Sequence, residues 1–406
     1  MEYHRSMADP FLPYGRHDID EEDVAAVAAV LRGDWLTGGP AVGQFEAALA
    51  ERVGARYAVA CSSGTAGLHL AAMAAGLGPG DKVIIPTLTF LATANAARYV
   101  GADVVFADVD ATTGLLGEAE FKSAMTRASG RTRAVFPVHL AGQTVDMRKM
   151  TRLAREHGLI LVEDACHALG TTFLDGNASF PVGACRYSDM AVFSFHPVKT
   201  IAMGEGGAIT TNNRGLYERL IRLRSHGMVR EVAQLRYADL AFDADRNLNP
   251  WYYEMPEIGF NYRASDVHCA LALSQLKKLD RFVSRRRELA DIYDRLLAPL
   301  APVVAVPRRV PDCNPAWHLY AVKIDFATAG IERAKLMHQL RSAGIGTQVH
   351  YIPVHLQPYY RQFVNTPTLP GATAYYQSVL SLPLFPSMTD ADVEGVVDNL
   401  STILRS

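Results

Sequence analysis

One segment, Phe193-Ser-Phe-His-Pro-Val-Lys-Thr-Ile-Ala-Met-Gly-Glu-Gly-Gly207, joins an apolar run to a glycine cluster and places a single lysine, Lys199, between them. The run at 190–195 predicts a buried strand, and Pro197 with the glycines predicts a tight loop after it. Lys199 is therefore expected at a strand end, facing a cleft. Burial disfavours the charged ammonium, so such a lysine can act as the nucleophile that forms a Schiff base. A solvated lysine in a glycine-rich loop is the alternative.

The composition is typical of a soluble globular protein that binds small molecules. The 406 residues are 49% hydrophobic and 20% charged, which is enough for two domains and a sizeable core. Forty basic and 42 acidic residues nearly balance, and without a basic block nucleic acid is not an expected partner. The five cysteines form no C-x-x-C pair and indicate neither a disulfide framework nor a zinc site. We therefore expect no metal and a reducing, cytoplasmic location.

Neither the N-terminus nor the one long uncharged run carries the pattern of a membrane segment. The N-terminus lacks the apolar run of a signal peptide. The uncharged run at 57–80 is interrupted by Ser62-Ser-Gly64, His69 and several glycines, so it does not predict a membrane span.

Seven short apolar runs alternate with helical patterns up to residue 211, after two helices expected at 18–31 and 44–53. This alternation predicts a parallel sheet with helices on both faces. Because ligands of such sheets bind at the carboxyl ends of the strands, the polar residues that follow the strands should converge in one cleft. The expected strands are 57–61, 82–85, 103–107, 134–138, 159–163, 190–195 and 208–211; the expected helices between them are 67–75, 91–99, 118–128 and 147–157; the strand-end residues are Ser62, Thr87, His139, Asp164 and His196.

The pattern changes after residue 260. Residues 264–297 predict one long helix or two joined helices that cross between domains. Beyond it, strands expected at 317–324 and 346–351 alternate with helices at 331–343, 372–379 and 390–404, which is typical of a smaller α+β domain. We expect an N-terminal tail at 1–17, a large domain at 18–270 and a small domain at 271–406 that includes the linking helix.

Two further motifs carry groups that a phosphorylated cofactor needs. Ser62-Ser-Gly-Thr-Ala-Gly-Leu-His69 follows a strand and opens a helix, so its N–H groups and hydroxyls could cradle a phosphate; an ordinary helix cap is the alternative. Asp164 follows an apolar strand and could pair with a protonated ring nitrogen, although a structural ion pair is also possible. Together with Lys199, these groups match what pyridoxal phosphate requires.

The order of the motifs resembles the pyridoxal-phosphate-dependent sugar-nucleotide aminotransferases (DegT/DnrJ type, aspartate-aminotransferase fold). The resemblance spans the chain from Leu12 to Leu404. It implies an α/β protein with the type I fold of pyridoxal-phosphate-dependent transferases, in which a large domain with a mostly parallel seven-stranded sheet precedes a smaller α+β domain. The motifs that carry it are Ser63-Gly-Thr-Ala66, Pro86-Thr-Leu-Thr-Phe90, Glu163-Asp-Ala-Cys-His167, Ser194-Phe-His-Pro-Val-Lys199, Gly204-Glu-Gly-Gly207 and Gly259-Phe-Asn-Tyr-Arg263.

The resemblance implies roles for four residues around the cofactor ring. Lys199 would hold pyridoxal 5'-phosphate through a Schiff base, and Asp164 would bind the ring nitrogen. Phe90 would stack on the ring and His167 would lie near the ring substituents. A plain core position is the alternative for Phe90.

The cofactor phosphate would be held by residues from two subunits. By resemblance, Thr65, Ala66 and Ser194 would bind it within one chain. Asn261 would reach the phosphate of the neighbouring subunit's cofactor, because members of this family share active sites across a homodimer. A turn position is the alternative for Asn261.

A late segment, Gly346-Thr-Gln-Val-His-Tyr-Ile-Pro-Val-His355, resembles the part that faces the sugar nucleotide in aminotransferases of pseudaminic acid biosynthesis. Those members aminate C4 of UDP-linked 4-keto-6-deoxy-N-acetylhexosamines. The resemblance assigns His350, Tyr351 and Arg263 to substrate binding; Arg230 and His355 lie in segments that could also reach the two phosphates of the substrate. The spacing of the two histidines matches no closed zinc site.

The expected reaction is transfer of an amino group from L-glutamate to C4 of such a UDP-linked keto sugar, in two half-reactions. Lys199 would serve both as Schiff-base partner and as general acid and base. Relatives that dehydrate sugars at C3 have a histidine at this position, so the lysine favours transamination. The alternatives are a 4-keto pentose or another 3- or 4-keto sugar as substrate, and a non-catalytic regulatory protein on the same fold.

Overall fold

The computed structural model describes residues 11–128, 130–363 and 367–405; the first ten residues of the expected tail lie outside them. A seven-stranded sheet in the order β1-β9-β8-β5-β4-β2-β3 forms its centre. All neighbouring strands are parallel except β9, which runs antiparallel to β1 and to β8. The expected mostly parallel sheet is therefore confirmed. The strands are β1 Tyr57–Cys61, β2 Asp81–Pro86, β3 Asp103–Ala107, β4 Arg131–Val135, β5 Ile160–Asp164, β8 Met190–Ser194 and β9 Gly207–Thr211.

The central strands are buried on both faces because their side chains alternate between two apolar clusters. In β8, Met190 and Val192 pack with the cluster around α3, whereas Ala191 and Phe193 pack with the one around α2 and α9. This double burial explains why β8 reads as a continuous apolar run. The helices of the large domain are α2 Pro40–Val53, α3 Gly64–Ala74, α4 Leu91–Tyr99, α5 Glu118–Arg127, α6 Met147–Glu156, α7 Arg214–Arg224 and α9 Asp266–Lys277.

A small second sheet lies beside the large domain and was not anticipated from the sequence. β6 (Thr172–Asp175) and β7 (Ala178–Pro181) form a hairpin, and β11 (Cys313–Asn314) pairs with β6. These strands have two to four residues and no buried side chain, so they carry no apolar alternation that would predict them.

The C-terminal part builds its own core around a third sheet, in the order β10-β12-β13. The prediction of a strand at 346–351 is wrong. This segment is extended, but it joins the sheet only through a bridge between Gln348 and Ser381. Its side chains face a cavity rather than a sheet neighbour. The elements of this part are α10 Leu279–Leu297, β10 Val304–Ala305, β12 Tyr320–Ile324, α11 Arg333–Ser342, α12 Pro358–Arg361, α13 Pro370–Ser378, β13 Val379–Leu382 and α14 Asp390–Arg405, with 3₁₀ turns at Ala298–Leu300 and Val354–Leu356. Two further 3₁₀ turns lie earlier in the chain, at Leu140–Gly142 and Val232–Gln234.

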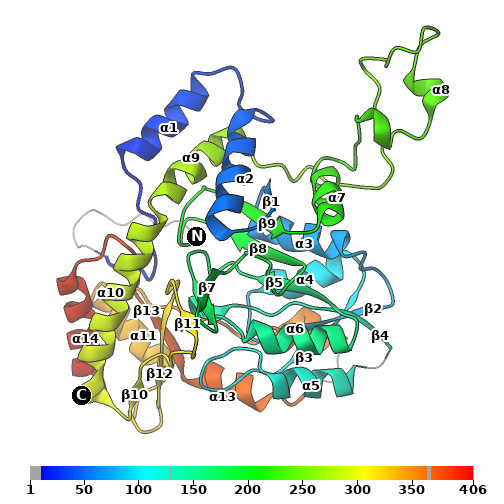
Figure 1. Ribbon diagram of the computed structural model, residues 1–406. Helices are drawn as coiled ribbons and strands as arrows, with labels where there is room; N and C mark the ends of the chain where they lie inside the picture. The colour runs from blue at the N-terminus through cyan, green and yellow to red at the C-terminus, as the bar shows by residue number, and fades with distance from the viewer. Residues whose placement is uncertain (1–10, 129, 364–366, 406) are drawn as a thin grey trace.

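Between α7 and α9 the chain leaves the body of the molecule as an extended arm, residues 228–258, which carries the short helix α8 (Ala238–Ala241) near its far end (Figure 1). Bridges between Val229 and Glu254 and between Phe242 and Leu248 hold its two halves together. The arm exposes an unusual set of large apolar side chains, namely Val232, Tyr237, Leu240, Leu248, Trp251, Tyr253, Met255 and Ile258. Within the described residues, no helix is both long and apolar enough to span a bilayer.

Helix α1 (Glu21–Leu31) packs against α9 and is fixed there by a buried ion pair. Lys278 Nζ lies 3.0 Å from Asp23 Oδ2 and also contacts Asp20, the N-cap of α1. Asp23 is fully buried and accepts a second hydrogen bond, of 2.6 Å, from Gln275. The positive charge of Lys278 therefore compensates the Asp23 carboxylate, which has no access to water.

We predict that Lys278→Met destabilises the protein by about 3–5 kcal/mol, because it leaves the buried Asp23 carboxylate without its cation. The adjacent Lys277 is exposed, so Lys277→Met is the matched control and should lie within about 0.5 kcal/mol of the wild type. Thermal or urea unfolding of the two variants measures the difference; equal stability would show that the ion pair does not hold α1.

Candidate active site

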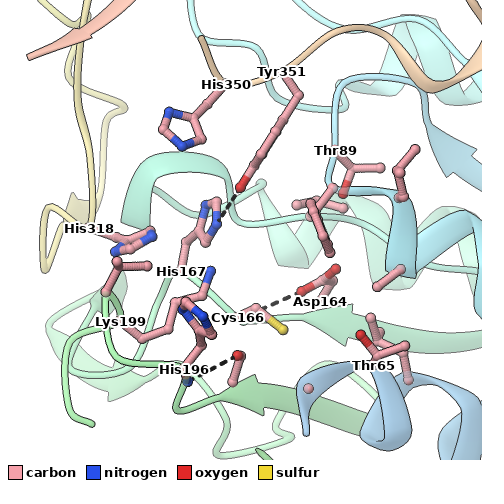
Figure 2. Close-up of a pocket in the computed structure, with 18 of the residues that line it drawn as sticks. Thr65, Thr89, Asp164, Cys166, His167, His196, Lys199, His318, His350 and Tyr351 are labelled. Atoms are coloured by element: carbon pink, nitrogen blue, oxygen red, sulfur yellow. Dashed lines mark hydrogen bonds between the residues drawn. The ribbon is translucent and has the colours of Figure 1, made fainter. Parts of the chain in front are cut away.

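A cavity of about 590 Å³ opens at the carboxyl ends of β5 and β8, beside the N-terminus of α3. The segment Gln348–Ile352 and Tyr14 border it from the C-terminal part and the N-terminal segment. Its size lies in the range of small-molecule sites. Figure 2 shows the side chains of Lys199, Asp164, His167, His350 and Tyr351 converging there.

Lys199 lies on a loop that is closed by hydrogen bonds between its ends. Phe195 N donates to Gly206 O, and Met203 N donates to Phe195 O, both at 2.9 Å. A Cβ at Gly206 would lie 2.2 Å from Met203 Sδ, so any larger residue there would require the Met203 side chain to move. The loop thereby carries Lys199 back over the end of β8.

The Lys199 amine makes no hydrogen bond or ion pair with the described residues, and the side chain is partly buried. Burial lowers its pKa, and the negative potential of Cys166 and Asp164 only partly opposes this. A larger fraction of Lys199 is therefore the neutral amine than for a solvated lysine, which is the form that attacks a carbonyl carbon.

Asp164 is the last residue of β5 and is 5% exposed. Its Oδ2 accepts a 2.6 Å hydrogen bond from Thr93 Oγ1, and its Oδ1 accepts one of 3.1 Å from Cys166 N. No Lys, Arg or His of the described residues forms an ion pair with it. A buried carboxylate without a cation suits a ligand that brings a protonated nitrogen.

The N-terminus of α3 offers donors for a phosphate. Ser63 caps the helix by accepting a 3.1 Å hydrogen bond from Ala66 N, whereas the N–H groups of Gly64 and Thr65 have no partner among the described residues. A Cβ at Gly64 would lie 2.7 Å from Ser194 Cβ, which shows how closely Ser194 approaches this turn. Thr65 and Ser194 border the cavity with Ser63 and Gly64, but the side chain of Ala66 does not.

His167 is held between the backbone of Ala141 and the phenol of Tyr351. Its Nδ1 accepts a 3.3 Å hydrogen bond from Ala141 N, so in the neutral ring Nε2 carries the hydrogen and donates to Tyr351 Oη at 3.0 Å (Figure 2). Burial, together with the charge of Lys199, keeps the pKa of His167 well below its usual range. Tyr351, whose pKa burial raises, therefore keeps its own hydrogen for a partner in the cavity.

His350 and Phe90 border the cavity at different depths. His350 is buried, and its Nδ1 shares a 2.8 Å hydrogen bond with Ser381 Oγ. Burial and the charge of Lys199 lower the pKa of His350 to about 3, so it is neutral. Phe90 is 55% exposed and lies at the N-cap of α4. It is therefore not a plain core residue.

Several residues considered from the sequence do not border this cavity, among them Arg230 and the strand-end residues Ser62, Thr87 and His139. Asn261 is exposed and bridges to Ser225, and neither it nor Arg263 borders this cavity. His355 is buried and pairs through Nδ1 with Thr87 Oγ1 at 2.6 Å, so it does not face the cavity. The described residues hold no group of three or more His, Cys, Asp or Glu placed to bind a metal ion.

Sequence reasoning missed four residues at the site: Tyr14, Thr89, Thr93 and His318. Tyr14 lies in the expected tail, where no periodicity gave a signal, yet its ring lies 5.4 Å from that of His350. His318 borders the cavity with its ring 4.3 Å from that of His167. Thr93 is the one with a readable signal, since it is a polar residue in the alanine-rich run Leu91-Ala-Thr-Ala-Asn-Ala-Ala97.

Comparisons with known proteins agree with this geometry. Residues 17–401 match the sequence model of the DegT/DnrJ/EryC1/StrS aminotransferase family. The chain is 40% identical over 398 residues to the spore coat polysaccharide biosynthesis protein SpsC of Bacillus subtilis (strain 168), covering 97% of each. It also matches the structure of Helicobacter pylori PseC, an aminotransferase involved in the biosynthesis of pseudoaminic acid, with a TM-score of 0.86 and 28% identity over 97% of this chain and 99% of that one.

A second solved structure is that of a putative sugar aminotransferase, Spr1654, from Streptococcus pneumoniae. In its PMP-form it has a TM-score of 0.86 and 26% identity, over 97% of this chain and 99% of that one. The same protein also matches in a PLP-form. The fold and the cofactor of this site therefore agree with those expected from the sequence.

We predict that His350 makes stability depend on pH. The unfolded chain binds a proton at His350 below its usual pKa of about 6.5, whereas the folded chain does not until about pH 3, so acidification in this window favours unfolding. Between pH 7 and pH 5 the wild type should lose about 2 kcal/mol more than His350→Gln, whose amide can still bond Ser381. Urea unfolding at both pH values measures this; identical losses would contradict it.

Proposed function

Because this chain belongs to the DegT/DnrJ/EryC1/StrS aminotransferase family, we propose that it moves an amino group from L-glutamate to C4 of a UDP-linked 4-keto-6-deoxy-N-acetylhexosamine. Aminotransferases of this family act on nucleotide-linked keto sugars with an amino donor. The choice of sugar is supported by one observation above all: His350 and Tyr351, from the segment that resembles aminotransferases of pseudaminic acid biosynthesis, border the same cavity as Lys199 and Asp164. The likeness to PseC supports the same choice.

Pyridoxal 5'-phosphate is the cofactor of this family, and the residues of the cavity fit it. The free N–H groups of Gly64 and Thr65 with the hydroxyl of Ser194 suit its phosphate, and the unpaired Asp164 suits its ring nitrogen. Phe90 offers a ring face at the mouth of the cavity. When bound, the cofactor supplies an electron sink that stabilises negative charge on the substrate carbon.

The side chains that border the cavity have separate roles in the proposed reaction. Lys199, kept partly neutral by burial, would hold the cofactor at its aldehyde carbon, and its amine would carry a proton to or from the substrate carbon. Asp164 would pair with the ring nitrogen and keep it protonated. Neutral His167 orients Tyr351, whose hydroxyl hydrogen is free to donate to an oxygen of the ligand.

The substrate test compares UDP-, dTDP- and GDP-linked 4-keto-6-deoxy sugars, with and without an N-acetyl group, each supplied with glutamate. We expect the UDP-linked N-acetyl sugar to be preferred by at least about tenfold in kcat/KM, the ratio that one buried hydrogen bond provides. NMR of the product should place nitrogen on C4. A 4-keto pentose is included as the rival substrate, and Lys199→Ala as the inactive control.

Nitrogen on C3, or faster turnover of the pentose or of a dTDP- or GDP-linked sugar, would overturn the substrate assignment. Neither result would affect the cofactor, because no step of that assignment depends on which sugar binds. Turnover by Lys199→Ala without added amine would instead remove Lys199 from the reaction.

We also propose that the enzyme is a homodimer in which each cavity is completed by the partner. The residues that border the cavity in one described chain include no arginine, although a sugar nucleotide brings two phosphates. Arg263 and Asn261 lie outside the cavity of their own chain and follow the arm closely in the sequence. The exposed apolar side chains of the arm, with Trp251 and Ile258 each 74% exposed, suit burial against a second copy.

Subunit mixing tests the shared site. When Lys199→Ala chains combine with Asn261→Asp chains, one site of each heterodimer carries both lesions and the other carries neither. Random exchange should then restore about one quarter of wild-type activity, since half of the dimers are mixed and each has one intact site. The matched control combines Lys199→Ala with Asp164→Asn, two lesions of the same cavity, and should restore nothing. Equal activity of the two mixtures, with heterodimers present, would exclude the shared site.

A further inference from the structure

Thr93 contacts the key carboxylate of the site from a neighbouring helix. Its side chain is fully buried in the first turn of α4, and its Oγ1 lies 2.6 Å from Asp164 Oδ2. Since an ionised carboxylate only accepts hydrogen bonds, the threonine hydroxyl must donate. This is the only side-chain hydroxyl that bonds Asp164 among the described residues.

The single hydrogen of Thr93 has three possible acceptors. Besides Asp164, these are Phe90 O at 3.3 Å and Thr89 Oγ1 at 2.8 Å. The charged acceptor at the shortest distance forms the strongest of these bonds. Thr89, which borders the cavity, then donates its own hydrogen to Thr93, so that the two hydroxyls form a directed pair ending on the carboxylate.

We propose that Thr93 is a positioning residue that holds the Asp164 carboxylate in the ring-facing geometry needed to keep the cofactor nitrogen protonated. Thr93 fixes Oδ2 from α4, while the N–H of Cys166 fixes Oδ1 from the loop after β5. Two donors from separate elements define the plane of the carboxylate and leave its remaining lone pairs for the ligand. This inference rests on the proposed function in one respect, namely that Asp164 pairs with the ring nitrogen.

A packing role alone does not account for Thr93. The site on α4 lies among Ala92, Ala94 and other buried apolar residues, where valine has the same shape and no hydroxyl to satisfy. A buried hydroxyl is costly unless it is hydrogen-bonded. The hydroxyl is therefore explained by the acceptor that it contacts.

The test uses Thr93→Val, which keeps the shape of the side chain, and Thr93→Ser, which keeps the hydroxyl. Holoenzyme is prepared with cofactor labelled with ¹⁵N in the ring, and the resonance shows whether the nitrogen is protonated. In the wild type and Thr93→Ser it should remain protonated through the neutral range, whereas Thr93→Val should lose the proton at lower pH. The kcat of Thr93→Val should fall roughly 10- to 100-fold, as expected for loss of a bond to a charged group, with KM for glutamate little changed.

Thr151→Val is the matched control, because Thr151 is also a buried helical threonine but bonds only the carbonyls of Met147 and Tyr187. It should lower stability without moving the ¹⁵N resonance. If Thr93→Val keeps wild-type protonation and kcat, the inference is wrong. If Thr93→Val does not fold, failure of Thr93→Ser to keep the resonance in place overturns it equally. An unprotonated nitrogen in the wild type would instead refute the pairing with Asp164 itself.

Discussion

The carboxylate of Asp164 is the constraint on which the rest of the site depends, because it is buried at the end of β5 and forms no ion pair with the described residues. Such a charge is costly to bury unless donors and a counter-ion surround it. Thr93 and the backbone of Cys166 provide donors, and the cofactor of this family provides the positive nitrogen. The folded chain is thus incomplete in an electrostatic sense, and the ligand completes it. For the same reason this cavity contributes less to the stability of the apo-protein than to that of the holoenzyme.

The imidazoles of His167 and His350 lie near Lys199 and are neutral. Protonation of His167 or His350 would place a second positive charge near the lysine, and in His167 it would break the hydrogen bond that Nδ1 accepts from Ala141 N. Burial opposes both protonations, so the lysine can share its surroundings with histidines without competing cations. The backbone of Ala141, at φ 58°, contributes by donating to His167 and accepting from His318 N at 3.0 Å. Positive φ in an alanine is a strained conformation, and here both of its peptide groups orient residues of the cavity.

Nearly all strands of the large-domain sheet were predictable from the sequence, because strands such as β5 and β8 are short apolar runs that end in a polar residue. Lys199, Asp164 and the turn at Ser63 were predictable for the same reason: each follows a strand that the pattern identifies. Tyr14 was not predictable, since the N-terminal segment has no periodicity, and His318 lies in the strand expected at 317–324, whose pattern gives no sign that it reaches the cavity. The strand predicted at 346–351 was wrong because the apolar residues of this segment face a ligand cavity rather than a sheet. The arm could not be recognised either, as its apolar residues are exposed in the single chain and follow no helical or strand period.

The reversed direction of β9 has a consequence for how this protein can change over evolution. Because β8 and β9 are antiparallel neighbours, the loop between them starts and ends at the same edge of the sheet, with Ser194 paired to Gly207. Both ends of the loop are therefore fixed in the ladder, and an inserted or deleted residue would displace Lys199 directly. The arm has the opposite character, since it joins the body only at its base and can vary in length without altering that loop. Relatives of this chain should thus diversify in length at the arm while the twelve residues 195–206 keep their number.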